Sequence, residues 1–344
     1  MNKRILVTGG TGFIGHYIIR RLVQSGYPVS VLVREGSPHR HTLEVFGRQI
    51  QVIWGDINNV ESLELACRDQ DIVVHAAAVV SFDSGQSREV LKVNVEGTAN
   101  LINVCLEQNI HQFIHLSSIA ALGGLPGQTN LDESTTWNEK NTSLYSKSKH
   151  LAELEVWRGS AEGLRVTILN PSLVIGPWET SHHSMQLFKA VQRNLPFYPS
   201  GSNGFVDVWD VADAVLLSVE KNITLERIII NGYNLSYREM LQKIATLMGK
   251  KVPNWLFPKS GAQFGAGVIR CLAFILGRKH YFQSSILKSI YSQRAYNNNK
   301  SIALLGLQYR PLNKTLNEII SYYADTDFLK KGIKPDNKFS TLPP

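Results

Sequence analysis

A tyrosine and a lysine stand four residues apart in Tyr145-Ser146-Lys147-Ser148-Lys149, a segment expected to open a helix. Side chains at this spacing lie on the same helix face. A free phenol has a pKa of about 10, too high for proton exchange at neutral pH, and a nearby ammonium lowers it by favouring the phenolate. The pair therefore predicts a group that exchanges a proton with a carbonyl or alcohol oxygen.

A third polar group is expected where the strand Phe113–Leu116 ends, because Ser117 and Ser118 follow it. One hydroxyl would hydrogen-bond the substrate oxygen and hold it against Tyr145, and the other would satisfy a turn. We choose Ser118 for the first role. Ser118, Tyr145 and Lys149 are thus the predicted catalytic residues.

A glycine-rich turn begins directly after the apolar run Ile5-Leu6-Val7 and reads Thr8-Gly9-Gly10-Thr11-Gly12-Phe13-Ile14-Gly15. A turn between a buried strand and a helix lets the backbone approach a pyrophosphate, which the helix N-terminus attracts. The sequence therefore predicts a dinucleotide site. Its predicted contacts here are Gly9, Gly12, Phe13, Ile14 and Gly15.

The end of the second strand, Val29–Val33, is expected to select the cofactor. An acidic residue there binds a ribose 2′-hydroxyl, whereas an arginine accommodates a 2′-phosphate. Arg34 holds this position, with Ser37 and Arg40 nearby, although Glu35 could turn inward instead. NADP(H) is therefore favoured, and NAD(H) stays open.

Further cofactor contacts are expected after the third and fourth strands, Gln51–Trp54 and Ile72–Ala76. Asp56, followed by Ile57, would approach the adenine amino group, unless it caps the next helix. The small residues Ala76-Ala77-Ala78 would let a dinucleotide lie across the strand ends, and His75 is expected to be packed.

Strands alternate with helices through the first half of the chain, which predicts an α/β fold with a Rossmann-type, doubly wound parallel sheet. The ligand then lies at the carboxyl ends of the strands. A smaller, mainly helical annex is expected to bind substrate. The other expected elements are helices at Tyr17–Val23, Val60–Cys67, Arg88–Gln108, Leu144–Trp157 and Val208–Glu220, and strands at Val166–Leu169 and Ile228–Ile230.

The predicted nucleotide domain spans residues 1–175, and residues 206–232 return to it. Residues 176–205 and 233–326 would form the annex, and 327–344 a mobile tail. A largely apolar substrate wall is expected, which would favour a hydrophobic substrate, although most of its members could instead pack the annex. Its candidate residues are Ser81, Phe82, Trp178, His182, Met185 and Phe188.

The net charge of +8 is unevenly distributed, because residues 240–317 hold twelve Lys and Arg and no Asp or Glu. Within them, the apolar stretch Phe264–Arg278 is too short and too polar to span a bilayer. A core helix is favoured there, and peripheral contact with an anionic membrane is the alternative. Nucleic acid is disfavoured because no recognised module is present. No signal peptide is visible, and Cys67, Cys105 and Cys271 lack metal-like spacing, which favours a reducing, cytoplasmic compartment and no metal.

As a set, these motifs resemble those of the extended short-chain dehydrogenase/reductases, which belong to the NAD-dependent epimerase/dehydratase superfamily. The resemblance covers residues 3 to about 215 and includes TGGTGFIG, Asp56-Ile57, Asn94–Thr98, Ser117-Ser118, YSKSK and Asn170–Pro177. It implies a Rossmann fold, a Ser118–Tyr145–Lys149 triad, cofactor contacts at Asn94, Pro171 and Leu173, and a homodimer formed by two long helices. Ser146–Trp157 and NPSLVIGP are most similar to dihydroflavonol-4-reductases and 3β-hydroxysteroid dehydrogenases.

The predicted activity is NADP(H)-dependent hydride transfer to or from a ketone, aldehyde or secondary alcohol. Tyr145 would move the proton, Ser118 would orient the oxygen, and Lys149 would tune Tyr145 and hold the ribose. A nucleotide-sugar epimerase or dehydratase with tightly bound NAD is the first alternative. The tyrosine that many sugar epimerases carry before Gly123 is absent here, where Leu122 stands. A non-catalytic dinucleotide sensor is the second alternative, although it would have no need of a tuned phenol.

Overall fold

The computed structural model describes residues 3–81, 84–125, 127–139, 142–178, 185–261 and 288–324. The strands are β1 (Ile5–Thr8), β2 (Val29–Val33), β3 (Ile50–Trp54), β4 (Ile72–His75), β5 (Gln112–Leu116), β6 (Asn130–Leu131), β7 (Val166–Pro171), β8 (Leu173–Ile175), β9 (Phe197–Tyr198), β10 (Ser202–Asp207), β11 (Glu226–Ile230), β12 (Tyr233–Ser236), β13 (Trp255–Leu256) and β14 (Ala295–Tyr296). The α-helices are α1 (Phe13–Gln24), α2 (Val60–Cys67), α3 (Ser87–Leu91), α4 (Gly97–Glu107), α5 (Leu144–Ala161), α6 (Gln186–Gln192), α7 (Val208–Glu220), α8 (Tyr237–Leu247) and α11 (Leu312–Ala324).

Seven parallel strands form the central sheet in the order β11-β7-β5-β4-β1-β2-β3. The order reverses between β1 and β4, and the crevice at such a switch point is where open α/β sheets bind ligands. The register pairs Thr8 with His75, His75 with His115, and Leu116 with Leu169. The segments that follow β1, β4, β5 and β7 therefore meet at one edge of the sheet.

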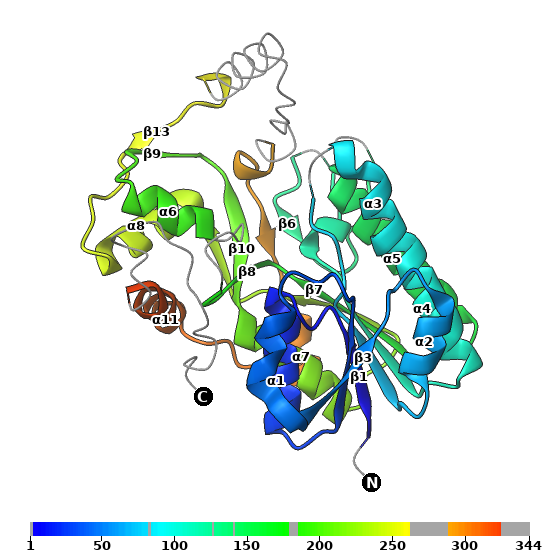
Figure 1. Cartoon of the computed structure of the whole chain (residues 1–344). Helices are drawn as coiled ribbons and strands as arrows, with labels where there is room; N and C mark the ends of the chain where they lie inside the picture. Colours follow the sequence, from blue (N-terminus) through cyan, green and yellow to red (C-terminus); the bar gives the residue numbers. More distant parts are fainter. Residues whose placement is uncertain are drawn as a thin grey trace.

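Helices cover both faces of this sheet, as Figure 1 shows. Alternate residues of each strand point to opposite faces, so Ile5 and Val7 join the core beneath α1 and α7, and Leu6 joins the core beneath α2, α4 and α5. A strand that is buried on both faces needs apolar residues at nearly every position. The predicted doubly wound α/β fold is confirmed.

The annex contains a second sheet that the sequence pattern did not predict. Its three strands have the order β12-β10-β8, with β10 parallel to β8 and antiparallel to β12. β8 pairs only with β10 among the described residues, although the predicted nucleotide domain extends to residue 175. α7 and β11 return to the central sheet, where α7 packs on α1. The domain boundaries stay a prediction.

Several predicted elements coincide with the structure, among them β2, α2 and α7. The helix expected at Arg88–Gln108 is instead three segments, because one π-helical turn, Lys92–Glu96, lies between α3 and α4. Cys67 and Cys105 are buried, as expected for small apolar residues. Cys271, the stretch Phe264–Arg278 and the tail 327–344 lie outside the described residues.

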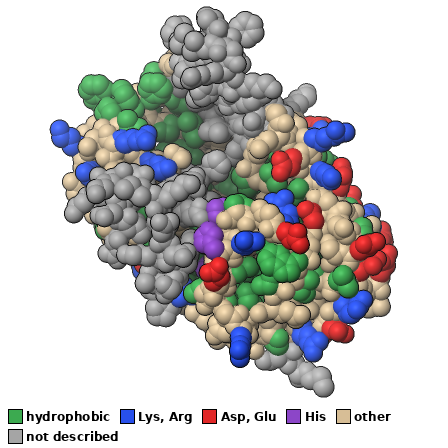
Figure 2. All heavy atoms as spheres, in the orientation of Figure 1, with side chains coloured by type: hydrophobic (Ala, Val, Ile, Leu, Met, Phe, Trp, Pro, Cys, Tyr) green, Lys and Arg blue, Asp and Glu red, His purple; other side chains and the backbone are tan. Residues whose placement is uncertain are grey.

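The annex exposes apolar and basic side chains near β9 and β13 (Figure 2). Within the described ranges, none of the helices combines the length and the hydropathy that crossing a bilayer requires.

Candidate active site

The glycine turn is closely packed against the end of β4. Gly9 has a φ of +73°, and a Cβ there would lie 2.5 Å from the backbone nitrogen of Ala77. A Cβ on Gly15 would lie 2.2 Å from the carbonyl oxygen of Gly9. Gly12 is the N-cap of α1 and provides no side-chain hydrogen bond, so no side chain of the cap covers the first N–H groups of that helix. This turn has the backbone-only surface that a pyrophosphate requires.

The side chains of Phe13 and Ile14 pack into the core beneath α1. Phe13 is buried, so its contact with a dinucleotide would be made through the backbone, whereas Ile14 is only partly buried. The same turn is linked to the end of β2, because Ser37 Oγ donates a hydrogen bond to Thr11 Oγ1 at 3.0 Å. Arg34 and Arg40 flank Ser37 along the chain, and both are exposed.

Asp56 follows β3 and accepts hydrogen bonds from the backbone and side-chain nitrogens of Asn58, at 2.8 and 2.9 Å. It does not cap α2, because Asn59 does so by accepting from Ser62 N. Ile57 is buried against Gly97. After β4, Ala76 N donates to Thr8 O at 3.1 Å, which holds Ala76 and Ala77 beside the glycine turn; Ala78 is exposed.

The three predicted catalytic residues come together where β5 ends beside α5. Ser143 caps α5 by accepting from Ser146 N at 3.0 Å, which places Tyr145 in the first turn. Ser118 hydrogen-bonds the Tyr145 hydroxyl, and its Oγ accepts from Ala120 N at 3.1 Å. Lys149 is 2% exposed, and its Nζ donates to Leu116 O at 2.7 Å.

Burial dominates the electrostatics of this group. It raises the pKa of Tyr145 to about 12, against a smaller opposing effect of the Ser118 hydrogen bond. The expected lowering of the Tyr145 pKa by Lys149 is therefore wrong for this structure, because desolvation of the phenolate outweighs any charge effect. Burial also lowers the pKa of Lys149 to about 8, and the negative charge of Glu153 acts in the opposite direction.

Asn94 lies in the π-helical turn and is 2% exposed. Its side chain accepts from Val79 N at 2.7 Å and donates to Val79 O and Ser148 Oγ at 3.0 and 2.9 Å. It thus joins the segment after β4 to α5, next to Lys149. Its predicted contact with the cofactor stays a prediction, as do those of Pro171, which is buried at the end of β7, and Leu173, in β8.

His75 is packed, as expected. Its ring nitrogens lie 2.7 Å from Thr8 Oγ1 and 2.9 Å from Thr98 Oγ1, and burial lowers its pKa to about 3. The ring of His115 lies 5.2 Å from that of His75, and burial lowers its pKa well below the ordinary value. Both histidines are therefore neutral at physiological pH.

A buried ionic cluster behind the catalytic group was not predicted. Glu153 Oε2 lies 2.7 Å from an Arg227 nitrogen, and Glu153 Oε1 accepts from Asn170 Nδ2 at 2.6 Å and from Ser117 Oγ. A signal was present in the sequence, because Tyr145, Lys149 and Glu153 repeat every four residues and so share one face of α5.

The predicted substrate wall is only partly described. Phe82 and His182 lie outside the described residues, and Ser81 is half-buried after β4. Trp178, Met185 and Phe188 are 4%, 1% and 5% exposed. Trp178 packs on Phe13 with ring centroids 5.6 Å apart, and Met185 and Phe188 belong to the annex core. These three residues pack in the core of the protein, and their assignment to the substrate wall stays a prediction.

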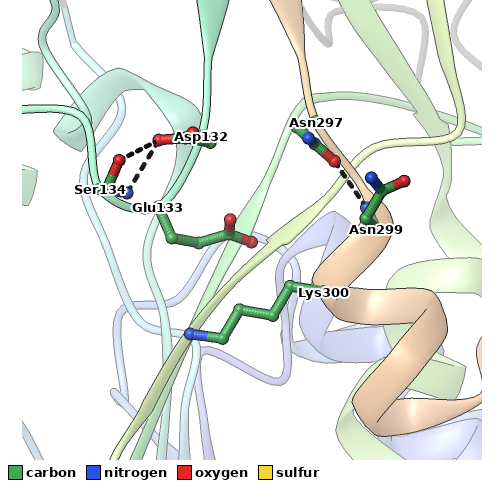
Figure 3. Close-up of a pocket in the computed structure, with 6 residues that line it drawn as sticks. All are labelled: Asp132, Glu133, Ser134, Asn297, Asn299 and Lys300. Atoms are coloured by element: carbon green, nitrogen blue, oxygen red, sulfur yellow. Dashed lines mark hydrogen bonds between the residues drawn. The ribbon is translucent and has the colours of Figure 1, made fainter.

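A separate hollow of about 480 Å³ lies between the segment after β6 and the helical turn after β14 (Figure 3). Glu133 and Lys300 point toward one another across it. Glu133 Oε1 accepts from Ile229 N at 2.9 Å, and Lys300 Nζ lies 2.6 Å from Glu226 Oε2. Its charged groups therefore have partners within the protein, and none of the predicted catalytic residues lines it. The lining residues are Asp132, Glu133, Ser134, Asn297, Asn299 and Lys300.

Known proteins are similar to this chain over most of its length. A putative dihydroflavonol 4-reductase of Synechocystis sp. is 27% identical over 94% of this chain and 95% of its own length. A UDP-glucose 4-epimerase of Vibrio cholerae is 27% identical over 77% of this chain and 83% of its own. The crystal structure of gox2253 is 28% identical, covers 94% of this chain and 98% of its own, and superposes with a TM-score of 0.81.

The sequence profile of the NAD dependent epimerase/dehydratase family matches residues 5–231, which include the glycine turn, Ser118, Tyr145, Lys149 and β11. The chain belongs to this family and is an NAD(P)-dependent enzyme of the extended short-chain dehydrogenase/reductase type.

Proposed function

We propose that the protein is an NADP(H)-dependent oxidoreductase that interconverts a ketone or aldehyde with its alcohol, and that its substrate is hydrophobic. The observation that carries this proposal is the convergence of the Ser118 and Tyr145 hydroxyls beside the buried Lys149, at the sheet edge that holds the glycine turn. The reductase name of the Synechocystis relative supports reduction as the reaction.

The residues have separable roles in the reducing direction. The raised pKa of Tyr145 keeps its phenol protonated at neutral pH, so Tyr145 donates a proton to the carbonyl oxygen. Ser118 Oγ accepts from Ala120 N and hydrogen-bonds the Tyr145 hydroxyl, so a substrate oxygen held by Tyr145 would also lie within reach of Ser118. Lys149 spans from α5 to Leu116 O and carries the charge of the site. A bound nicotinamide supplies the hydride.

The preference for NADP(H) rests on the end of β2. Arg34 and Arg40 are exposed on either side of Ser37, which is hydrogen-bonded to the glycine turn. A guanidinium offers a planar set of donors that matches the oxygens of a phosphate. No acidic side chain occupies position 34, where one would bind a ribose 2′-hydroxyl.

The test is a fluorescence titration of the purified protein with NADPH and NADH, followed by a panel of apolar ketones, aldehydes and nucleotide sugars. Tighter NADPH binding and oxidation of NADPH by an apolar carbonyl compound would support the proposal. Copurified NAD together with turnover of a nucleotide sugar alone would overturn it in favour of the epimerase. Cofactor binding without turnover of any compound would favour the sensor.

The assembly and location of the protein are further proposals. A homodimer would pair the long helices of two copies, and Leu154 of α5 is 49% exposed as a candidate contact. A cytoplasmic location, with peripheral contact to anionic membranes, is proposed from the cysteine usage and the basic region 240–317.

A further inference from the structure

Glu153 is a carboxylate that the proposed chemistry does not use, yet it is 2% exposed and lies one helical turn beyond Lys149. An uncompensated charge is costly to bury, and this one has three partners: Arg227, Asn170 and Ser117. Each comes from a different strand or strand end, namely β11, β7 and the end of β5. One carboxylate therefore holds α5 against three neighbouring strands at the edge where the catalytic group lies.

Two of these contacts reach Ser118. Ser117 is its chain neighbour, and Asn170 Nδ2 donates both to Glu153 Oε1 at 2.6 Å and to Ser118 O at 2.9 Å. The backbone on either side of the Ser118 Cα is thus tied, directly or through one amide, to the helix that carries Tyr145. A hydroxyl must be placed within a few tenths of an ångström to share one oxygen with a second donor.

We propose that Glu153 is a positioning residue for proton transfer: it fixes Ser118 relative to Tyr145 and sustains the positive charge of the buried Lys149. The effect that this inference predicts on turnover rests on the proposed function. The electrostatic part of the inference concerns the protein alone and can be measured without any substrate.

The charged and titratable groups around Lys149 come from four elements. Tyr145 and Glu153 lie on α5 itself, His75 on β4, His115 on β5, and Arg227 beyond Glu153 on β11. The two histidines are neutral and Tyr145 is protonated near pH 8, so Glu153 is the anion that offsets the burial of Lys149. Removing this anion lowers the pKa of Lys149. Burial raises the pKa of Glu153 and Arg227 opposes that rise, so removing Arg227 also weakens the ionisation of Glu153 and gives no single direction for Lys149.

The first experiment titrates the Lys149 ammonium by NMR in protein labelled with ¹⁵N-lysine, the signal being assigned with Lys149→Arg. We expect it to titrate at lower pH in Glu153→Gln than in the parent. Glu155→Gln is the matched control, because Glu155 lies on the same helix and pairs with Arg158 at 2.8 Å, away from this cluster. It should leave the titration unchanged.

The second experiment measures NADPH oxidation against pH with the carbonyl compound identified by the panel. Glu153→Gln should lower kcat on the order of tenfold with little change in cofactor affinity, and Glu153→Asp should recover part of the loss. In Glu153→Gln, the fall of activity at alkaline pH should begin at a lower pH than in the parent. If Glu153→Gln does not fold, Glu153→Asp carries the test, because it keeps the charge and should leave the Lys149 titration near that of the parent while kcat falls.

The outcomes separate the two proposals. An unchanged Lys149 titration in Glu153→Gln would overturn the proposed role of Glu153. If Tyr145→Phe loses turnover but Glu153→Gln keeps the turnover and pH profile of the parent, this inference alone is overturned. Active Tyr145→Phe would overturn the proposed function, and the NMR titration would still decide the role of Glu153.

Discussion

Lys149 Nζ donates a hydrogen bond to the carbonyl oxygen of Leu116 at 2.7 Å, which ties α5 to the end of β5. The ammonium is thereby held at the residue that precedes Ser117 and Ser118, and Lys149 is 2% exposed. Burial at this position lowers the pKa of Lys149 to about 8, whereas the pKa of Tyr145 is raised to about 12. The two groups therefore lose their protons in widely separated pH ranges.

This separation predicts the pH dependence of carbonyl reduction. Lys149 carries its charge below about pH 8 and loses it as the pH rises through that value, while Tyr145 stays protonated. We expect kcat/KM to be level in the neutral range and to fall above pH 8. Stopped-flow NADPH oxidation from pH 6 to 10 measures it.

Lys149→Arg provides the control for that profile, since a guanidinium keeps its charge throughout this range. Its activity should be lower but should show no fall near pH 8. If the activity of Lys149→Arg falls near pH 8 as in the parent, a group other than Lys149 titrates there.

Tyr145→Phe removes the proton donor while retaining the aromatic ring. General acid catalysis of this kind contributes ~10²- to 10⁴-fold, so turnover should fall within that range. NADPH affinity, measured by fluorescence, should change little. Tyr27→Phe is the control, because Tyr27 precedes β2 and so lies at the amino-terminal ends of the strands, opposite the site. Turnover of Tyr145→Phe equal to that of the control would refute the assignment.

Much of this site could be predicted because it depends on local order along the chain. The apolar run Ile5-Leu6-Val7 before the glycine turn specifies a buried strand and the backbone that follows it. Tyr145 and Lys149 share a helix face because they are four residues apart in one helix. These features need no knowledge of distant contacts, and the structure agrees with them.

The features that were missed depend on distant contacts. β10 contains Asn203 and Gly204 and lacks an apolar alternation, so only its pairing with β8 and β12 defines it as a strand. The direction of the Tyr145 pKa shift depends on burial, which a four-residue spacing does not reveal. The π-helical turn at Asn94 likewise follows from contacts with Val79 and Ser148.

Arg34→Ala tests the preference for the phosphorylated cofactor. Loss of a charge-assisted hydrogen bond costs about 1.5–3 kcal/mol, so NADPH affinity should fall ~10- to 100-fold. NADH affinity should stay within about twofold, because NADH has no 2′-phosphate to lose contact with. Isothermal titration calorimetry measures both. Arg48→Ala, a second exposed arginine of the same region, is the control, and equal losses for the two cofactors would contradict the prediction.

The exposed aromatic side chains near β9 and β13 make membrane contact testable. Trp255 is 65% exposed, and the ring of Phe197 lies 5.8 Å from that of Trp255 and 5.4 Å from that of Phe257. Exposed cations of the same segments are Arg193, Lys250, Lys251 and Lys259. Aromatic rings beside cations suit the interface of an anionic bilayer.

We therefore expect the protein to sediment with phosphatidylglycerol-containing vesicles and less with purely zwitterionic ones, and to be released as salt is raised. Trp255→Ser should weaken this binding on the order of tenfold, because the indole no longer leaves water. Trp54→Ser removes an indole that is 52% exposed on the edge strand β3 and should bind as the parent does. Equal binding of both variants would show that the β9–β13 aromatic residues do not contact the lipid, and absence of sedimentation with either vesicle would exclude the membrane contact itself.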